Sequence, residues 1–220
     1  MNVGQFIERF RRDRQDEATA PLWTDAEIID DYLNDAVEEA CQRAHLIEDA
    51  TSAFTSIAWA ADVESTQLPA YVLKVLRLTC DGRKLSESSI EELDATCGQY
   101  WEAHTGTPSA FYFERNGMLR LYPIPAAAAT VKIRVSRLPV DRYSASMDTE
   151  EPEIPQQWHA KLLNWMYRCA LMKNDAETID PNKAADFEAR FIGDFGIREN
   201  ANVERKHRDK SPNVVQYNSF

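Results

Sequence analysis

The hydrophobic positions in the first fifty residues repeat with the spacing of amphipathic helices. Val3, Phe6 and Phe10 recur every three or four residues, which predicts a short helix at the start of the chain. A second helix is predicted from Thr24, because Glu27 follows three residues later and the two can form a capping box. Its apolar face is predicted to run to about residue 44 through Ile28, Ile29, Tyr32, Leu33, Ala36, Val37, Ala40 and Cys41.

From about residue 52 the repeat shortens to two residues, which is typical of β-strands. Two dipeptides, Asp81-Gly82 and Asn116-Gly117, are favourable two-residue hairpin turns. Two such hairpins close together favour an antiparallel β-subdomain over βαβ units. The predicted strands cover 54–60, 71–80, 83–85, 110–115, 118–122 and 131–135.

Helical spacing returns after a polar linker at 141–153. Pro155 is predicted to open one helix, and Asp180 followed by Pro181 reads as the N-cap and first residue of another. The second helix should end near Gly196, and residues 198–220 form a polar tail. The predicted apolar faces are Trp158, Leu162, Trp165, Met166, Cys169 and Ala170 in the first helix, and Ala184, Phe187, Phe191, Ile192 and Phe195 in the second.

These elements predict an α+β fold, an antiparallel helical bundle with an inserted antiparallel β-subdomain and an extended C-terminal tail. Each helical part has one apolar face that it cannot bury alone, so the two parts are expected to pack together. The predicted boundaries are 1–51 and 153–197 for the bundle, 52–152 for the β-rich insertion and 198–220 for the tail. An aromatic core is predicted inside the insertion, formed by Tyr71, Phe111, Phe113 and Tyr122.

The charge is strongly negative, at −11 for 25 Lys and Arg against 36 Asp and Glu in 220 residues. Such a chain is repelled by nucleic acid and anionic membranes unless its charges are segregated. No stretch approaches the ~20 apolar residues of a membrane span, so no membrane partner is expected. The four cysteines are far apart, and buried thiols in a reducing cytoplasm are favoured over a disulfide or a metal site.

The charges are unevenly placed along the chain. Residues 24–51 hold nine acidic side chains against Arg43 alone, and 198–220 hold five Lys or Arg against three acidic residues. The acidic helix face is a candidate inter-subunit surface, formed by Asp30, Asp31, Asp35, Glu38 and Glu39, with Asn34 among them. A solvated face, or a divalent-cation site at Asp30, Asp31 and Asp35, is the alternative.

The tail is a candidate segment for binding a neighbouring subunit, and a frayed terminus is the alternative. The candidate binding residues of the tail are Arg198, Arg205, Lys206, Arg208, Lys210, Val214, Val215, Tyr217 and Phe220.

Catalytic signatures are missing from the sequence. It has no phosphate-binding glycine loop, no zinc-protease motif and no nucleophile-elbow motif. His45, His104, His159 and His207 have no partner at ligand spacing, and His159 is expected at a helix surface or core edge. Trp158 and Trp165 favour a core role over base stacking because of their helical spacing. We therefore predict a protein that is not an enzyme and has no cofactor.

Several segments, taken in their order and spacing, resemble one known family. The most characteristic is 119–125 (LRLYPIP), which follows an aromatic strand at 111–113 (FYF). The chain resembles the head-to-tail adaptor proteins of tailed bacteriophages over about residues 23–195. The other matching segments are 23–29 (WTDAEII), 32–36 (YLNDA), 68–69 (LP), 81–85 (DGRKL), Trp101, 106–108 (GTP) and 154–155 (IP) before the Trp-His helix.

This resemblance implies a non-enzymatic virion protein that works as one copy of a ring. The ring, usually dodecameric, sits under the portal protein in the virion neck, carries double-stranded DNA through its channel without binding it specifically, and offers a platform to tail or nozzle proteins. Assembly in the host bacterial cytoplasm is implied as well. The resemblance further implies that the tail reaches the portal or a neighbouring subunit, and it makes the acidic helix face a candidate channel lining. An acidic channel would let DNA slide, because phosphate contacts hold DNA on proteins. The alternatives are a small metal-dependent enzyme using Asp30, Asp31 and Asp35, and an acidic monomeric binding module.

Overall fold

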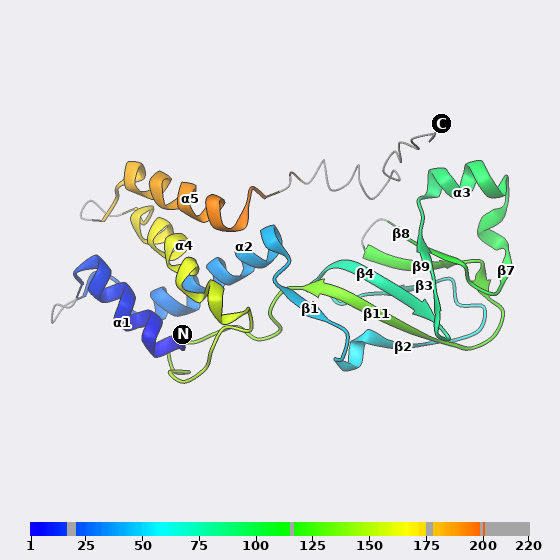
Figure 1. The fold of residues 1–220 in the computed structure, drawn as a ribbon, viewed down its shortest axis with the longest axis horizontal. Helices are drawn as coiled ribbons and strands as arrows, with labels where there is room; N and C mark the ends of the chain where they lie inside the picture. Colours follow the sequence, from blue (N-terminus) through cyan, green and yellow to red (C-terminus); the bar gives the residue numbers. More distant parts are fainter. Residues whose placement is uncertain (17–20, 115–116, 175–177, 199, 201–220) are drawn as a thin grey trace, which may run out of the picture. The chain divides into compact units, whose positions relative to one another are not determined.

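The protein has two compact units, each with its own core. A computed structural model describes residues 1–16, 21–114, 117–174, 178–198 and 200. The helical unit consists of residues 1–48 and 136–198, and the β-rich unit of residues 49–135 (Figure 1). The helical unit thus resumes at 136, whereas we predicted that it would resume at 153.

Residues 136–152 belong to the helical unit because their backbone bonds to its helices. The Tyr143 N–H donates to the Asn34 side-chain oxygen at 2.8 Å, and the Ala145 N–H donates to the Asp30 carboxylate at 2.9 Å. The Tyr143 hydroxyl in turn accepts from the Glu153 N–H at 2.8 Å. The segment predicted from the sequence to be a polar linker is therefore held to the helical unit by hydrogen bonds.

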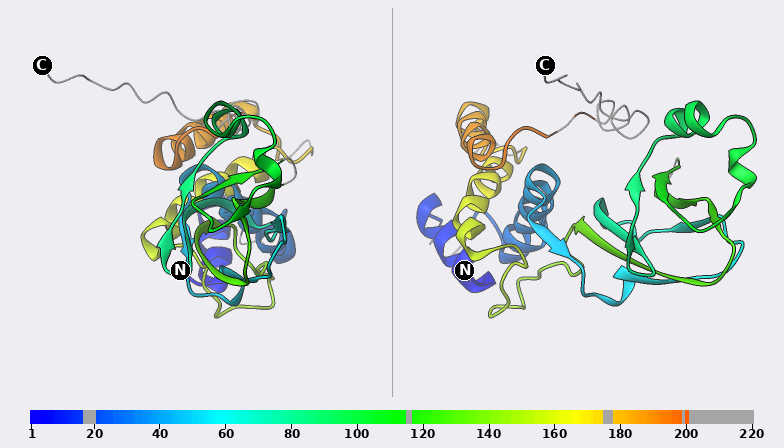
Figure 2. Two further views of the ribbon diagram at one scale, coloured as in Figure 1. Left: turned by 90° about the vertical axis from the view of Figure 1, so that its right-hand side faces the viewer. Right: turned by 45° about the vertical axis from the view of Figure 1, so that its right-hand side comes forward.

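The helical unit is organised around one central helix. Helix α4 contacts α1, η1, α2 and α5, and the last two also contact each other (Figure 2). Its core includes Phe6, Phe10, Ile28, Leu162 and Phe191, all fully buried. The helices are α1 (Val3–Arg14), η1 (Glu27–Leu33), α2 (Asn34–Ala44), η5 (Gln156–Trp158), α4 (His159–Leu171) and α5 (Pro181–Phe195).

The helix-capping signals read from the sequence are confirmed. The Glu27 N–H donates to the Thr24 hydroxyl at 3.1 Å, and the Thr24 N–H donates to the Glu27 carboxylate at 2.9 Å. The Asp180 carboxylate accepts from the Lys183 N–H at 3.1 Å, with Pro181 as the first helical residue. Both arrangements satisfy donors that the first turn of a helix leaves unpaired.

The start of the second predicted helix is a π-helix, η1, which continues directly into α2. At their junction the Asn34 side-chain nitrogen lies 3.0 Å from both the Ile29 and Asp30 carbonyl oxygens, and 2.8 Å from the Tyr143 carbonyl oxygen. Asn34 is only 4% exposed. Our prediction that Asn34 lies on the solvent-exposed face of the helix was wrong. The wider π-helical turn directs its side chain inward, where the amide donates to buried carbonyl oxygens.

The β-rich unit contains two main sheets. The first has the order β1-β11-β4-β5, with β2 paired antiparallel to β11, and the second has the order β3-β9-β8-β6. A short parallel pair, β10 and β7, completes the unit. The strands are β1 (Ile47–Asp49), β2 (Ser56–Trp59), β3 (Ser65–Gln67), β4 (Val72–Cys80), β5 (Arg83–Lys84), β6 (Ser86–Glu87), β7 (Thr105–Gly106), β8 (Ala110–Phe113), β9 (Met118–Tyr122), β10 (Ile124–Pro125) and β11 (Ala129–Arg137).

The sheets are mixed, and the prediction of a purely antiparallel subdomain was wrong. Strands β6 and β8 pair in parallel, with Ser86 opposite Ala110 and Glu87 opposite Phe111. A parallel pair needs a crossover connection. Here the crossover contains helix α3 (Ile90–Cys97), the 3-10 turn η3 (Trp101–Ala103) and strand β7.

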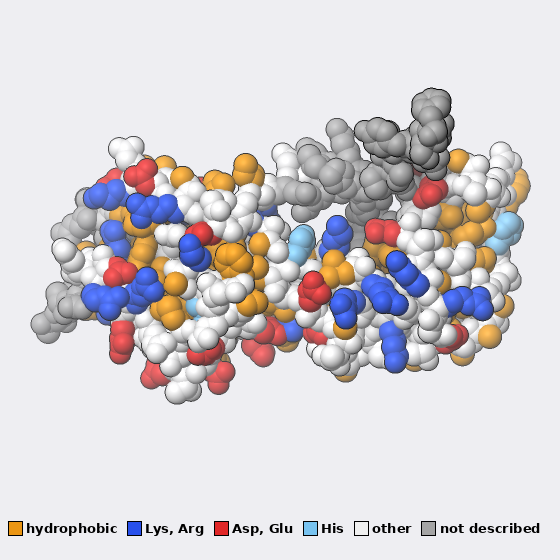
Figure 3. Space-filling view, in the orientation of Figure 1, with side chains coloured by type: hydrophobic (Ala, Val, Ile, Leu, Met, Phe, Trp, Pro, Cys, Tyr) orange, Lys and Arg blue, Asp and Glu red, His pale blue; other side chains and the backbone are white. Residues whose placement is uncertain are grey.

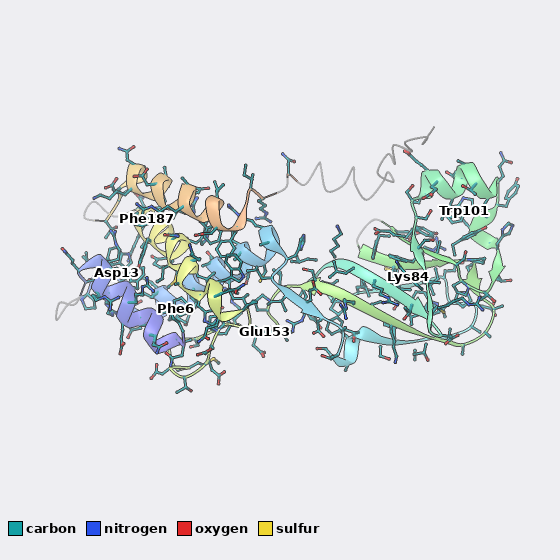
Figure 4. All side chains as sticks on the ribbon, viewed as in Figure 1. Phe6, Asp13, Lys84, Trp101, Glu153 and Phe187 are labelled. Carbon is teal, nitrogen blue, oxygen red and sulfur yellow. The ribbon has the colours of Figure 1, made fainter. Side chains whose placement is uncertain are left out.

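Each main sheet contributes one face to the core of the β-rich unit. Leu78, Val131 and Val135 from the first sheet pack with Leu119 and Leu121 from the second. The four predicted aromatic core residues do not form one cluster. Phe111 and Phe113 join the main core, Tyr71 packs on Phe54, and Tyr122 packs on Trp101 (Figure 4), which is 3% exposed in a second small cluster with Leu93 and Tyr112.

The first predicted hairpin turn is confirmed. Asp81 and Gly82 have φ of 47° and 80°, and Thr79 pairs with Lys84 across them. The second connection is one residue longer than predicted, because the Glu114 N–H donates to the Met118 carbonyl at 2.9 Å and leaves three residues between. Gly117 has the expected positive φ of 73°, and Asn116 lies outside the described residues.

Candidate interaction surfaces

The acidic face of η1 and α2 is less uniform than the sequence indicates. Asp31 and Asp35 are exposed, whereas Asp30, Glu38 and Glu39 are half-buried. The three half-buried carboxylates have partners inside the helical unit. Asp30 accepts from the Ala145 N–H, Glu38 lies 3.4 Å from Arg142, and Glu39 lies 2.7 Å from Arg43 and 3.2 Å from Arg198. Of these five carboxylates, only Asp31 and Asp35 have neither a hydrogen bond nor an ion pair from their side chain to another described residue.

A shallow hollow of about 190 Å³ opens beside this face. Next to the lining residue Trp165, the Arg43 guanidinium packs against two rings that also contact each other, 5.1 Å from the Trp165 centroid and 5.2 Å from that of Phe191. Burial raises the pKa of the Asp35 carboxyl above its usual value, and Asp31 and Glu39 add to the rise against the opposing effect of Arg142. The hollow is lined by Asp35, Glu38, Glu39, Gln42, Trp165 and Arg198.

The alternative of a metal site at Asp30, Asp31 and Asp35 receives no support. Across the described parts of the chain, no group of three His, Cys, Asp or Glu side chains could hold a metal ion. Asp30 is instead turned toward the backbone of Ala145. These three carboxylates are close in the sequence, but their surroundings in the structure differ.

A second charged surface lies on the outer face of the first sheet and was not singled out from the sequence. Figure 3 shows a group of Lys and Arg side chains over the β-rich unit. The alternation in the sequence of β11 could have indicated this surface, because burial of Val131, Ile133 and Val135 leaves the residues between them exposed on the opposite side of the strand. We call this surface the basic sheet face: Lys74 and Arg77 of β4, Lys84 of β5, and Lys132 and Arg134 of β11, all exposed.

Comparison with known families identifies the chain. The family model described as SU10 adaptor protein matches residues 1–216. The chain belongs to this family of phage head-to-tail adaptors. No curated protein matches it. The adaptor is therefore a structural protein of a bacteriophage virion, as the resemblance implied.

The tail of the adaptor is described only at its start. Arg198 is exposed, and its guanidinium lies 3.2 Å from the Glu39 carboxylate. The other predicted tail residues, Arg205, Lys206, Arg208, Lys210, Val214, Val215, Tyr217 and Phe220, lie outside the described residues. The binding role of the tail thus stays a prediction.

The aromatic side chains of η5 and α4 have a packing role in the adaptor. Trp158 packs on Phe195 with ring centroids 5.4 Å apart, and Trp165 packs on Phe191 at 4.9 Å. Tyr167 links two further helices, because its hydroxyl donates to Asp13 at 2.7 Å and its ring lies 5.1 Å from that of Phe187 (Figure 4). Both tryptophans pack against aromatic rings of α5 as a core role predicts, but each is only half-buried, so they lie at the edge of the core.

His159 and the cysteines are held in the interior or near it. His159 is 1% exposed, contrary to the expected surface or core-edge position, because its ring nitrogens lie 2.9 Å from the Ile154 carbonyl and 2.7 Å from the Met1 amino nitrogen. All four cysteines are free thiols. Burial raises the pKa of Cys41 to about 12 and that of Cys169 to about 11, so both stay protonated at neutral pH. No helix in the described part of the adaptor is long and apolar enough to cross a membrane.

Proposed function

We propose that the adaptor assembles into a ring, dodecameric as in the family it resembles, that docks under the portal protein in the virion neck. The ring extends the DNA channel and offers a platform to tail or nozzle proteins, and it assembles in the host bacterial cytoplasm. The observation that carries this proposal is the family match over residues 1–216, which spans both compact units.

The charge of the protein supports a channel that does not retain DNA. A formal net charge of −11 repels phosphate, and a protein holds DNA chiefly by neutralising phosphates with Lys and Arg. Double-stranded DNA would therefore pass through the ring without specific binding.

The ring and its docking are tested by measuring the mass of the adaptor, alone and after mixing with the portal protein of the same virus. We expect about twelve adaptor copies on each portal ring, seen by mass photometry and by electron microscopy of the complex. An adaptor that stays monomeric and unbound in the presence of portal would contradict the proposal and favour an acidic monomeric binding module.

The tail is proposed to hold the portal or a neighbouring subunit. Deletion of residues 199–220 leaves Arg198 and its ion pair with Glu39 in place, so the truncated chain should fold as the full chain does. We expect it to melt within about 2 °C of the full-length adaptor, since surface changes rarely alter stability much, but to dissociate from portal rings during gel filtration. Portal binding equal to that of the full chain would reject this role for the tail.

A further inference from the structure

The basic sheet face is arranged in rows across the strands of the first sheet. Thr79 of β4 pairs with Lys84 of β5, and the Thr79 hydroxyl lies 3.4 Å from the Lys132 carbonyl oxygen on β11. Lys132 pairs in turn with Ser56 of β2. Cross-strand partners point to the same side of a sheet, so Lys84 lies beside Thr79 on the outer face. Lys132 is on this face as well, because it is exposed between the buried Val131 and Ile133 of β11. Figure 4 shows Lys84 over this sheet.

Further cations extend this row along the strands. Arg77 lies two residues before Thr79, and Arg134 lies two residues after Lys132, which places both on the same face. In β4 both Leu76 and Arg77 are exposed, so the alternation of buried and exposed side chains shifts by one residue there. Lys74 is therefore exposed on the outer face as well. Leu76 is 43% exposed and gives the surface an apolar side chain among its cations.

Four of the five cations on this face have little charge compensation within the β-rich unit, whereas the fifth, Arg134, has an interaction partner. Among the residues that the structure describes, Lys74, Arg77, Lys84 and Lys132 form no ion pair. Arg120 on the other sheet differs, because it lies 2.5 Å from Glu64 and 2.6 Å from Glu114. Like charges on neighbouring strands destabilise a sheet. The unit therefore keeps a repulsive arrangement on one face that a negatively charged partner would relieve.

The partner charge is present on the same chain. Residues 1–48 and 136–198 contain 23 Asp and Glu against 13 Lys and Arg, a net formal charge of −10, so the helical unit holds most of the negative charge. On its surface Asp31 and Asp35 are exposed and lack an ion pair with any described residue. Burial raises the pKa of the Asp35 carboxyl above its usual value, and the neighbouring carboxylates of Asp31 and Glu39 add to this rise, although Arg142 opposes it.

We propose that the basic sheet face of one adaptor subunit docks on the acidic face of η1 and α2 of the next subunit, presented by Asp31 of η1 and Asp35 of α2. This inference rests on the proposed ring. Two different, complementary surfaces on one chain make a head-to-tail contact, and such a contact closes into a ring when its rotation allows. DNA is the less favoured occupant, because the net charge of −11 opposes its approach, while a second copy presents both a basic and an acidic face.

Paired charge reversals test this contact. The sheet variant carries Lys84→Glu and Lys132→Glu, and the helix variant carries Asp31→Lys and Asp35→Lys. All four side chains are exposed, so both variants should keep the circular dichroism spectrum and melting temperature of the parent. Each variant alone should lose self-association by about tenfold or more and should fail to form complete rings on portal, because like charges then face each other across the contact.

An equal mixture of the two variants should restore rings. In the mixture, the acidic sheet of one variant meets the basic helix of the other, and the two unreversed faces meet at the alternate contacts. The matched control, Glu87→Lys with Glu102→Lys, changes two exposed acidic residues of the β-rich unit outside both faces and should assemble normally.

Three results would overturn the proposal while leaving the ring intact: normal rings from either reversed variant alone, no rescue in the mixture, or a sheet variant that assembles normally but loses salt-sensitive retention of a short DNA duplex. The last result would assign the basic sheet face to DNA. Failure of the unmodified adaptor to form a ring on portal would instead refute the proposed function itself.

Discussion

At the scale of single residues, buried polar side chains hold segments that are distant in the sequence. Asn34 joins the π-helical turn to the segment around Tyr143, and both partners are at least nine-tenths buried. Hydrogen bonds of this kind contribute little net stability when intact, but the loss of one partner leaves the other buried group without a hydrogen bond. Such residues should therefore be more sensitive to truncation than their polarity indicates.

Replacing Asn34 by alanine tests this sensitivity. The change leaves the Tyr143 N–H and the carbonyls of Ile29 and Asp30 without their side-chain partner, so we expect the free energy of unfolding to fall by about 2–3 kcal/mol. Chemical denaturation measures it. The control is Asn164→Ala, at a half-buried position of α4, and it should change stability by less than about 0.5 kcal/mol. Equal effects from both substitutions would show that the Asn34 network has no special role.

Glu27 should make stability depend on pH. Its carboxylate accepts from the Lys173 ammonium at 2.7 Å and from the Thr24 N–H at 2.9 Å, and these bonds lower its pKa below the ordinary value of 4.5. A lowered carboxyl pKa adds stability that is present above pH 4.5 and lost as the pH falls through the folded-state pKa. Glu27→Gln should therefore cost about 0.5–1 kcal/mol near neutral pH, because the pair is partly exposed.

The measurement is the difference in unfolding free energy between parent and Glu27→Gln as a function of pH. We expect this difference to shrink steadily below pH 4.5. Lys173→Met should weaken the same pH dependence, because it removes the ammonium that lowers the pKa. A difference that is constant down to strongly acidic pH would mean that the Glu27 charge does not contribute.

At the scale of elements, local backbone rules decide where helices and hairpins begin and end. Gly117 has φ of +73° at the connection of β8 and β9, a conformation that residues with a Cβ adopt reluctantly. Gly193 lies inside α5, where an added Cβ meets open space and the backbone is helical. The same substitution at these two positions should thus have opposite effects.

Gly117→Ala should destabilise the adaptor by about 1–2 kcal/mol, because alanine pays a steric cost at positive φ. Gly193→Ala should stabilise it by about 0.5–1 kcal/mol, because alanine is the better helix former. Thermal melting followed by circular dichroism reports both. Unchanged stability in Gly117→Ala would contradict the positive φ at this connection.

At the scale of the whole molecule, the chain builds two units whose cores use separate sets of residues. The main core of the β-rich unit is formed entirely between Phe54 and Val135. Because that core needs no side chain from the helical unit, residues 47–137 should fold alone as a fragment. We expect a β-rich circular dichroism spectrum and one cooperative melting transition. A spectrum without ordered structure would show that the helical unit is needed to close the sheets.

The sequence by itself determined the local features of this adaptor. The 3.6-residue repeat located the α-helices of the helical unit, and the two-residue repeat and turn signals located six of the eleven described strands. The Thr24–Glu27 and Asp180–Pro181 signals located helix starts. Asp81-Gly82 located a hairpin. These features depend on residues a few positions apart, whose conformational preferences are already set by their neighbours in the chain.

The tertiary structure alone decided what distant residues do to one another. Asn34 is buried by Tyr143, and Glu38 and Glu39 are partly neutralised by Arg142 and Arg198, all more than one hundred positions away. The parallel pairing of β6 with β8 and the gathering of cations on the basic sheet face likewise arise from strand order. Burial and electrostatic pairing depend on distance in space, and periodicity shows which face of an element is polar but not which charge that face meets.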